Sequence, residues 1–335
     1  MSRNRIWIGL LVAAAAVAAG IGIWSGAGPR RGVEPLVKVV VGAYAGDTGA
    51  LVYIAADRGF FAANGLDVTI RDFEAGKLAA DALLAGEVDI STSAEFVFVS
   101  NSFVHRDLRV MGTIATARSN ELVVRRDRGI FTASDLRGRR IGVTRKSTGE
   151  FFLGRCLLFS GLSIRDVEII DLNPSEIVNA MIAGEIDAAA TWDPNAYQIR
   201  KELKLKTHSL SARSGQAFYF ILLTRDSWLK SHPAAAERFL RSVIQAQDFV
   251  SDHSDDARRW MGQRFDYDPA YLQYSWAKHR FVVTLPQALL LAVEDEARWM
   301  IENEMTNEKR IPNYLDFLWL DGLDGVRPQA ISIIR

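Results

Sequence analysis

Apolar residues follow two alternating patterns along the first two thirds of the chain. Short, nearly continuous apolar runs, such as 36–42 and 140–143, are typical of strands buried on both faces of a sheet. Between such runs, apolar residues recur at helical spacing, for example across 50–61. The alternation predicts βαβ units, and hence an α/β fold with mainly parallel sheets flanked by helices.

One six-residue stretch occurs twice. Residues 85–90 read AGEVDI and residues 183–188 read AGEIDA. Each copy ends a helix-patterned run and turns through a glycine into a short apolar strand. The repeat predicts two lobes built on one plan. The acidic pairs Glu87/Asp89 and Glu185/Asp187 recur at the same place, so we assign them to the turn rather than to chemistry.

Two β-rich segments are expected to connect the lobes. Residues 117–125 and 216–224 lie between or after the repeated units, and the chain then becomes mostly helical. We therefore predict a two-lobed fold with two hinge crossings and a cleft. The predicted helices after the second crossing are 226–250, 255–265, 269–276 and 286–304. The predicted boundaries are 36–118 and 225–335 for lobe 1, and 119–224 for lobe 2.

The N-terminal segment has the features of an export signal. Arg3 and Arg5 precede a charge-free apolar run over 6–24, which ends in the small residues 25–27. The run is also close to the roughly 20 residues that span a bilayer, so 1–27 is either a cleaved signal peptide or an uncleaved membrane anchor. Residues 28–35 read as a linker. We expect a periplasmic or otherwise extracytoplasmic protein.

Composition excludes several classes of function. The 335 residues include 40 Lys+Arg and 40 Asp+Glu, so no excess of positive charge attracts nucleic acid. The only cysteine, Cys156, lies in an apolar helical run and is expected to be a buried, inert thiol. The five histidines have no metal-ligand spacing, and no phosphate-binding or hydrolase motif is present. We predict no catalytic residue, no metal, no cofactor and a monomer.

Four turns at predicted strand ends, where open α/β sheets bind ligands, are the candidate small-molecule site. Trp192 is interpreted as a stacking wall, with Tyr44, Phe218 and Tyr219 as weaker candidates. Ser91, Thr92 and Ser93 either contact ligand or cap the next helix. Arg145 suits an acid, whereas Glu95 and Asp193 suit an amine, so the charge of the ligand stays open. The candidates are Tyr44, Asp47, Thr48, Ser91, Thr92, Ser93, Glu95, Arg145, Ser147, Thr148, Trp192, Asp193 and Tyr219.

Several motifs in order resemble a family of exported binding proteins. They are IAADRGFFAANGL at 54–66, the two AGE copies, DLRGRRIGV at 135–143, and Trp-Asp-Pro at 192–194. These residues resemble the periplasmic substrate-binding proteins of ABC transporters for nitrate, sulfonates, taurine or thiamine-precursor pyrimidines. The resemblance implies a type II two-lobed fold, a non-enzymatic role and delivery of a solute to ABC permease subunits.

The resemblance also implies where the ligand binds and which alternatives remain. Binding residues fall on the 42–48 turn, 91–93, 147–148 and 192–193, but Arg145 and Lys146 stand where relatives often have small residues. That departure leaves the ligand class open. One alternative is an enzyme like the thiamine-pyrimidine synthases, from which this chain departs by its single cysteine and its export signal. The other is a membrane-anchored ligand sensor, if the N-terminal segment is retained.

Overall fold

The computed structural model describes residues 35–210 and 217–334. Leu36–Arg335 form one compact unit. The predicted signal peptide or anchor at 1–27 lies outside the described residues, so it stays a prediction. Within the described ranges, no helix combines the length and apolarity needed to cross a membrane.

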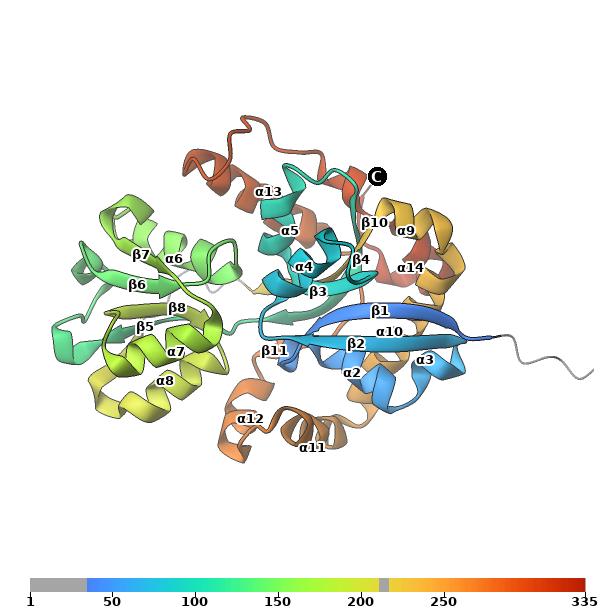
Figure 1. The fold of residues 1–335 in the computed structure, drawn as a ribbon, viewed down its shortest axis with the longest axis horizontal. Helices are drawn as coiled ribbons and strands as arrows, with labels where there is room; N and C mark the ends of the chain where they lie inside the picture. The colour runs from blue at the N-terminus through green and yellow to red at the C-terminus, as the bar shows by residue number, and fades with distance from the viewer. Residues whose placement is uncertain (1–34, 211–216, 335) are drawn as a thin grey trace, which may run out of the picture. The chain divides into compact units, whose positions relative to one another are not determined.

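The unit contains two sheets, each with its own flanking helices (Figure 1). In the first sheet, the order is β11-β4-β10-β3-β1-β2. Strand β1 runs parallel to β2 and β3, whereas β10 lies antiparallel between β3 and β4. The strands are β1 (Val37–Tyr44), β2 (Leu66–Phe73), β3 (Ile90–Ala94), β4 (Leu108–Ala117), β10 (Phe218–Arg225) and β11 (His279–Arg280).

The second sheet has the order β7-β6-β8-β5-β9. Strand β6 is parallel to β7 and β8, and β5 is antiparallel to β8 and β9. Its strands are β5 (Asn120–Arg125), β6 (Arg140–Val143), β7 (Glu168–Asp171), β8 (Ala188–Trp192) and β9 (Thr207–Leu210). Two smaller apolar clusters form its core, whereas one large cluster forms the core of the first lobe.

Both sheets are mixed rather than mainly parallel. Only the strands joined through helices run parallel, while β4, β5 and β10, which enter or leave a lobe, run antiparallel to their neighbours. The first crossing lies between β4 and β5. Strand β10 pairs in the first sheet, although the predicted second lobe extends to residue 224. The return therefore lies between β9 and β10.

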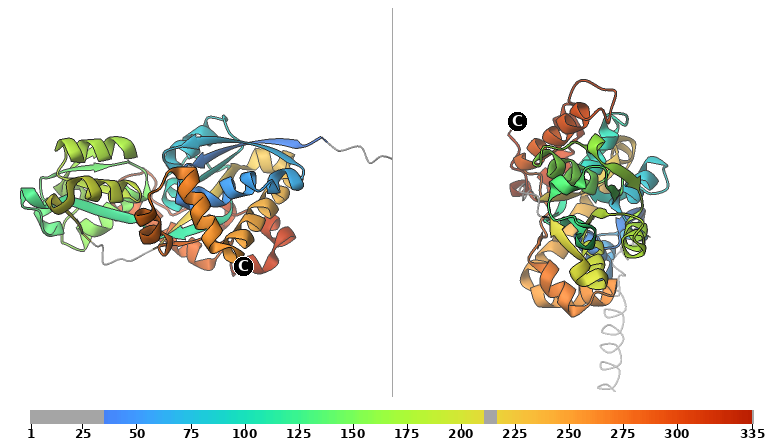
Figure 2. Two further views of the ribbon diagram at one scale, coloured as in Figure 1. Left: turned by 90° about the horizontal axis from the view of Figure 1, so that it is seen from below. Right: turned by 90° about the vertical axis from the view of Figure 1, so that its left-hand side faces the viewer.

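Helices cover the faces of both sheets (Figures 1 and 2). Two predicted helices are each divided into two. Gly59 adopts a φ of 70° between α2 and α3, and Pro233 begins α10 after α9 has ended. The helices are α2 (Ala50–Asp57), α3 (Phe60–Ala63), α4 (Gly76–Leu84), α5 (Glu95–Ser102), α6 (Thr148–Leu158), α7 (Pro174–Ala183), α8 (Asn195–Leu203), α9 (Asp226–Ser231), α10 (Pro233–Asp252), α11 (Ser254–Phe265), α12 (Pro269–Trp276), α13 (Gln287–Glu302) and α14 (Leu320–Val326).

Seven short 3-10 helices complete the described elements, and η1 follows β1 directly. The 3-10 helices are η1 (Asp47–Gly49), η2 (Arg126–Arg128), η3 (Ala133–Leu136), η4 (Ile164–Asp166), η5 (Lys204–Lys206), η6 (Tyr314–Phe317) and η7 (Pro328–Ala330).

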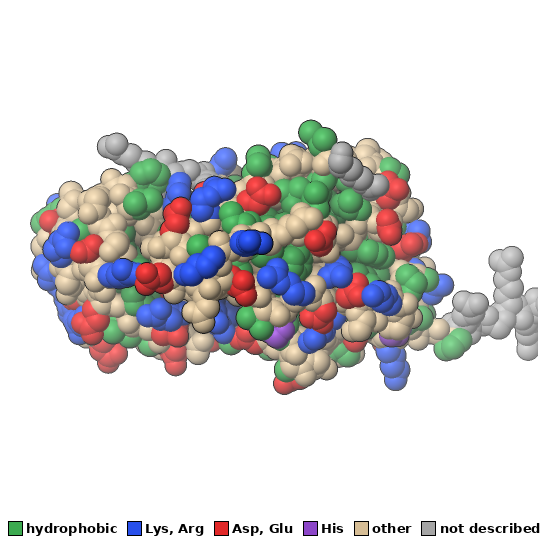
Figure 3. Space-filling model, turned by 90° about the horizontal axis from the view of Figure 1, so that it is seen from above, with side chains coloured by type: hydrophobic (Ala, Val, Ile, Leu, Met, Phe, Trp, Pro, Cys, Tyr) green, Lys and Arg blue, Asp and Glu red, His purple; other side chains and the backbone are tan. Residues whose placement is uncertain are grey.

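Charged side chains of both signs are interspersed over the face shown in Figure 3.

The aspartate of each repeat performs the same structural task. The carboxylate of Asp89 accepts a hydrogen bond from the Val40 backbone N–H at 2.8 Å, and its own N–H donates to the Val40 carbonyl. Asp187 repeats both bonds with Arg140, at 3.1 and 2.8 Å. Asp89 thus joins the start of β3 to β1, and Asp187 joins the start of β8 to β6. The assignment of the repeat to the scaffold is confirmed.

Candidate functional site

A cavity of about 420 Å³, including its open mouth, lies between the two lobes. The carboxyl ends of β1 and β8 and the first turns of α4 and α6 surround it. This is the position at which open α/β sheets bind ligands. The lining residues are Tyr44, Asp47, Thr48, Ala75, Gly76, Lys77, Ala94, Val97, Ser119, Ser147, Thr148, Trp192, Phe218 and Phe220.

Aromatic side chains from both lobes form one wall. The Trp192 indole Nε1 donates a hydrogen bond to the Tyr44 hydroxyl at 3.3 Å, which joins the second lobe to the first. The Tyr44 ring packs against Phe220 with 5.7 Å between ring centroids. Trp192 is only 9% exposed and belongs to the apolar core that is centred on the first lobe. An apolar wall with few polar groups suits a small organic ligand.

Two helix N-termini point polar groups at the same space. Ser147 is the N-cap of α6, and its hydroxyl accepts a hydrogen bond from Gly149 N–H at 3.2 Å. Helix α4 begins at Gly76 without a side-chain cap. Lys77 follows it in the lining, and its ammonium pairs with Asp81 at 2.5 Å. A Cβ at position 76 would lie 2.7 Å from the Ser93 Cα, so only glycine permits this approach. Uncapped N–H groups and the helix dipoles favour an anionic or acceptor group here.

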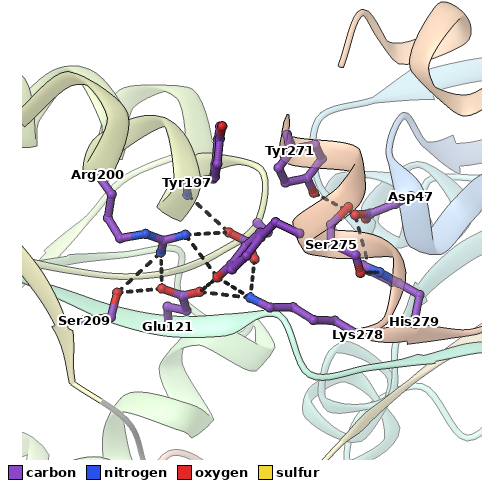
Figure 4. Close-up of polar contacts among 11 residues, drawn as sticks. Asp47, Glu121, Tyr197, Arg200, Ser209, Tyr271, Ser275, Lys278 and His279 are labelled. Atoms are coloured by element: carbon purple, nitrogen blue, oxygen red, sulfur yellow. Dashed lines mark hydrogen bonds and ion pairs between the residues drawn. The ribbon is translucent and has the colours of Figure 1, made fainter. Parts of the chain in front are cut away.

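Asp47 is nearly fully buried, and its charge is compensated within the protein. Its carboxylate accepts a hydrogen bond from the Tyr271 hydroxyl at 2.8 Å and lies 3.3 Å from the His279 Nε2 (Figure 4). It also accepts a hydrogen bond from the Thr48 N–H at 3.0 Å. Burial opposes ionisation, but His279 and these donors outweigh it and hold the pKa of Asp47 below its usual value. Asp47 therefore fixes the turn after β1 against the C-terminal elements.

Beside the cavity lies an interlobe ion cluster, formed by Glu121, Asp193, Arg200 and Lys278 (Figure 4). Lys278, from the first lobe, lies 2.8 Å from Asp193 and 3.2 Å from Glu121, both in the second lobe. Arg200 pairs with Glu121 and lies 3.6 Å from Asp193. Burial and then Glu121 raise the pKa of Asp193 to about 6, despite Lys278 and Arg200. Through Lys278, the cluster forms ion pairs between the two lobes beside the cavity.

Six of the predicted site residues line the cavity between the lobes: Tyr44, Asp47, Thr48, Ser147, Thr148 and Trp192. Ser91, Thr92 and Ser93 instead belong to β3 and are fully buried in the sheet. Thr92 accepts a hydrogen bond from the Tyr44 N–H at 2.9 Å. These three residues do not cap α5, because its N-cap is Ala94 and has no side-chain cap hydrogen bond.

The remaining four predicted residues lie outside this lining. Arg145 extends outward, with its side chain 49% exposed, and pairs with Glu150 at 3.4 Å. Asp193 is directed into the interlobe ion cluster. The Tyr219 N–H donates to the Glu95 carboxylate at 2.8 Å, and Glu95 lines a second cavity.

Sequence reasoning missed Gly76, Lys77, Ser119 and Phe220 in the lining, and Lys278 beside it. A signal existed for Gly76 and Lys77, since they begin a predicted helix after a strand. No sequence signal identifies Lys278, because its partners are distant in sequence and come from the other lobe.

A family model described as NMT1/THI5 like matches residues 48–257. A putative binding protein of Brucella abortus is 27% identical over 207 residues, which cover 60% of this chain and 62% of the relative. The taurine-binding periplasmic protein of Escherichia coli is 29% identical over 195 residues, which cover 57% of this chain and 60% of that protein. The chain thus spans about 62% of the length of the curated relatives that it matches first.

Solved structures show the same fold. The alkanesulfonate-binding protein SsuA of Xanthomonas axonopodis pv. citri, bound to MOPS, superposes with a TM-score of 0.74 at 19% identity. The match covers 85% of this chain and 99% of SsuA. The predicted two-lobed α/β fold of periplasmic binding proteins is confirmed.

Proposed function

Because the chain belongs to the NMT1/THI5-like family, we propose that it is an extracytoplasmic solute-binding protein. It captures a small organic or anionic solute, of the sulfonate, nitrate or pyrimidine type, and delivers it to the permease subunits of an ABC importer. The observation that carries the proposal is the cavity between the lobes, lined by strand ends and helix starts from both. The taurine-binding and alkanesulfonate-binding proteins among the similar proteins support a sulfonate in particular.

The cavity suggests how such a solute binds. Its acid group lies at the first turns of α4 and α6, beside Lys77 and Thr148, where backbone N–H groups and helix dipoles favour negative charge. Its organic part packs against Trp192 and Tyr44. Because the two lobes supply different parts of this site, binding stabilises their closed arrangement and marks the loaded protein for a permease.

The proposal also covers location and chemistry. The N-terminal segment directs export, and the protein acts as a monomer outside the cytoplasmic membrane without converting its solute. The mass of the mature protein tests whether residues 1–27 are retained. Incubation with each bound solute, followed by mass spectrometry, tests the non-enzymatic role, and any new product contradicts it.

A melting-shift screen tests the function itself. A solute at 100 times its Kd stabilises the folded protein by about 2.7 kcal/mol, which raises Tm by several degrees. We expect this from at least one member of a set of sulfonates, nitrate, aminopyrimidines and aromatic acids. The absence of any shift at millimolar concentration contradicts the proposal for these classes.

A matched pair of variants tests the anion site. Lys77→Met removes the cation that lines the cavity and is expected to weaken binding of an acid about tenfold. Lys38→Met removes an exposed lysine of β1, away from the cavity, and serves as the control. Equal affinities for the two variants contradict the placement of the acid group.

A further inference from the structure

A second cavity, of about 370 Å³ including its open mouth, adjoins the first. Thr148 and Phe218 line both cavities, so a single solute in one is in reach of the other. The first cavity has an apolar wall and two helix N-termini. The second contains ionisable side chains, Glu95 and Glu296 from the first lobe and Arg155 from the second.

The two carboxyl groups are buried with unused hydrogen-bonding capacity. Glu95 begins α5 and Glu296 lies within α13, and each is 2% exposed. One oxygen of Glu95 accepts the Tyr219 N–H at 2.8 Å. Within 35–210 and 217–334, neither the Glu95 Oε2 nor the Glu296 Oε2 has a hydrogen-bond partner. Buried polar groups are normally satisfied, so unpaired oxygens on two glutamates that line one cavity indicate an absent partner.

Their electrostatic surroundings point to a cation as that partner. Burial raises the pKa of Glu95 to about 8, and burial together with Glu95 and Asp295 raises the pKa of Glu296. Arg155 is the cation that lines this cavity in the described ranges. Its Nε is buried without a partner there, and its Nη1 lies 3.9 Å from Asp295. Ionisation of both carboxyls therefore requires a second positive charge in the cavity.

We propose that this cavity receives the positively charged nitrogen of the solute, between Glu95 and Glu296, so that the solute is zwitterionic, an amino-substituted acid. The inference rests on the proposed function, because it assumes a solute whose acid group occupies the first cavity. The ammonium donates hydrogen bonds to the two free carboxyl oxygens. The acid group lies in the first cavity, on the other side of Thr148, at the N-termini of α4 and α6.

Matched probes separate the ammonium from the rest of the solute. Taurine is compared with propane-1-sulfonate, and 4-(2-aminoethyl)benzenesulfonate with 4-propylbenzenesulfonate. In each pair a methyl group replaces the ammonium at nearly equal size. We expect the ammonium probe of at least one pair to bind about tenfold tighter or more by calorimetry, because a site with buried acceptors rejects a ligand that lacks the donor.

Proton release is a second readout. The raised pKa values keep at least one proton on the empty carboxyl pair near neutral pH, and an entering ammonium favours the ionised form. Calorimetry in two buffers of different ionisation enthalpy is therefore expected to show proton release with the ammonium probe and none with its methyl counterpart. Equal proton release for both contradicts the inference.

Two variants and one control complete the test. Glu296→Gln and Glu95→Gln each remove one negative charge at equal size, and each is expected to reduce the preference for the ammonium about tenfold. Glu294→Gln removes an exposed carboxylate from the same helix and is expected to keep the preference. Binding of the methyl probes without an ammonium preference overturns the inference but leaves the proposed function in place. Failure of all four probes to bind overturns the inference, and capture of these sulfonates with it.

Discussion

Replacing Lys278 with methionine tests whether the interlobe ion cluster holds the two lobes together. The Lys278 Nζ lies 2.8 Å from Asp193 and 3.2 Å from Glu121. Methionine keeps most of the side-chain volume and removes the charge. Among the described residues, the fully buried Asp193 carboxylate then keeps Arg200, at 3.6 Å, as its counter-charge.

The expected magnitude follows from this geometry. Two unit charges about 4 Å apart attract by about 4 kcal/mol at an effective dielectric constant of 20. Desolvation of Lys278 opposes this attraction, and Arg200 already compensates part of the charge on Asp193. We therefore expect a net coupling of about 2 kcal/mol between Lys278 and Asp193, in the range for hydrogen bonds between charged groups. This corresponds to roughly thirtyfold in an equilibrium constant.

A double-mutant cycle measures the coupling. The unfolding free energies of the wild type, Lys278→Met, Asp193→Asn and the double variant are determined in urea. Small-angle scattering then tests whether Lys278→Met increases the radius of gyration without solute, as opening of the lobes requires. The control cycle uses Lys230 and Asp226, an i,i+4 pair within one lobe whose lysine is exposed, with an expected coupling below about 0.5 kcal/mol.

Two results would refute this reasoning. One is a coupling between Lys278 and Asp193 no larger than that of the control pair. The other is a normal coupling with an unchanged radius of gyration, which would show that the cluster stabilises the fold without holding the lobes closed.

Three further predictions concern the cavity and its surroundings. Burial lowers the pKa of His279, but Asp47 outweighs burial and raises that pKa above 6.5. The pair therefore stabilises the folded protein at lower pH, and this stabilisation is lost as pH rises through the raised pKa. Urea midpoints measured from pH 6 to 9 should fall accordingly in the wild type and less in His279→Asn; equal slopes would contradict the pairing. Trp192→Ala should weaken binding of a solute identified by melting shift at least tenfold, and Trp192→Phe much less; unchanged affinity in calorimetry would place the wall elsewhere. Gly154→Ala should cost about 1–3 kcal/mol in urea unfolding, because its Cβ would lie 2.2 Å from the Trp299 ring; wild-type stability would show that the ring moves freely.

The order of strands and helices was readable from the sequence because hydrophobic spacing and turn residues are local signals. The helix predicted at 269–276 coincides with α12, whose N-cap Asp268 accepts a hydrogen bond from the Tyr271 N–H. The turns after β1 and β8 and before α6 were placed at the cavity for the same reason. Each follows a buried strand and carries polar or aromatic residues.

Features that depend on long-range pairing were not readable. The serines and threonine of β3 have the composition of a turn, yet β3 pairs with β1 and β10 inside the sheet, and these side chains are fully buried. Its neighbour β10 belongs to the first sheet but follows the whole second lobe in sequence. The carboxyls of Glu95 and Glu296 likewise come from helices about two hundred residues apart in sequence. Only the folded chain brings such groups together.

The nested position of the second sheet has a consequence for the order in which the chain folds. Strands β5 to β9 occupy an uninterrupted stretch, and their first and last members are antiparallel neighbours. The first sheet is incomplete until β10, near its centre, has been made. During synthesis from the N-terminus, all strands of the second lobe are complete before β10, a central strand of the first lobe, has been made. The lobe that begins second is therefore expected to finish first.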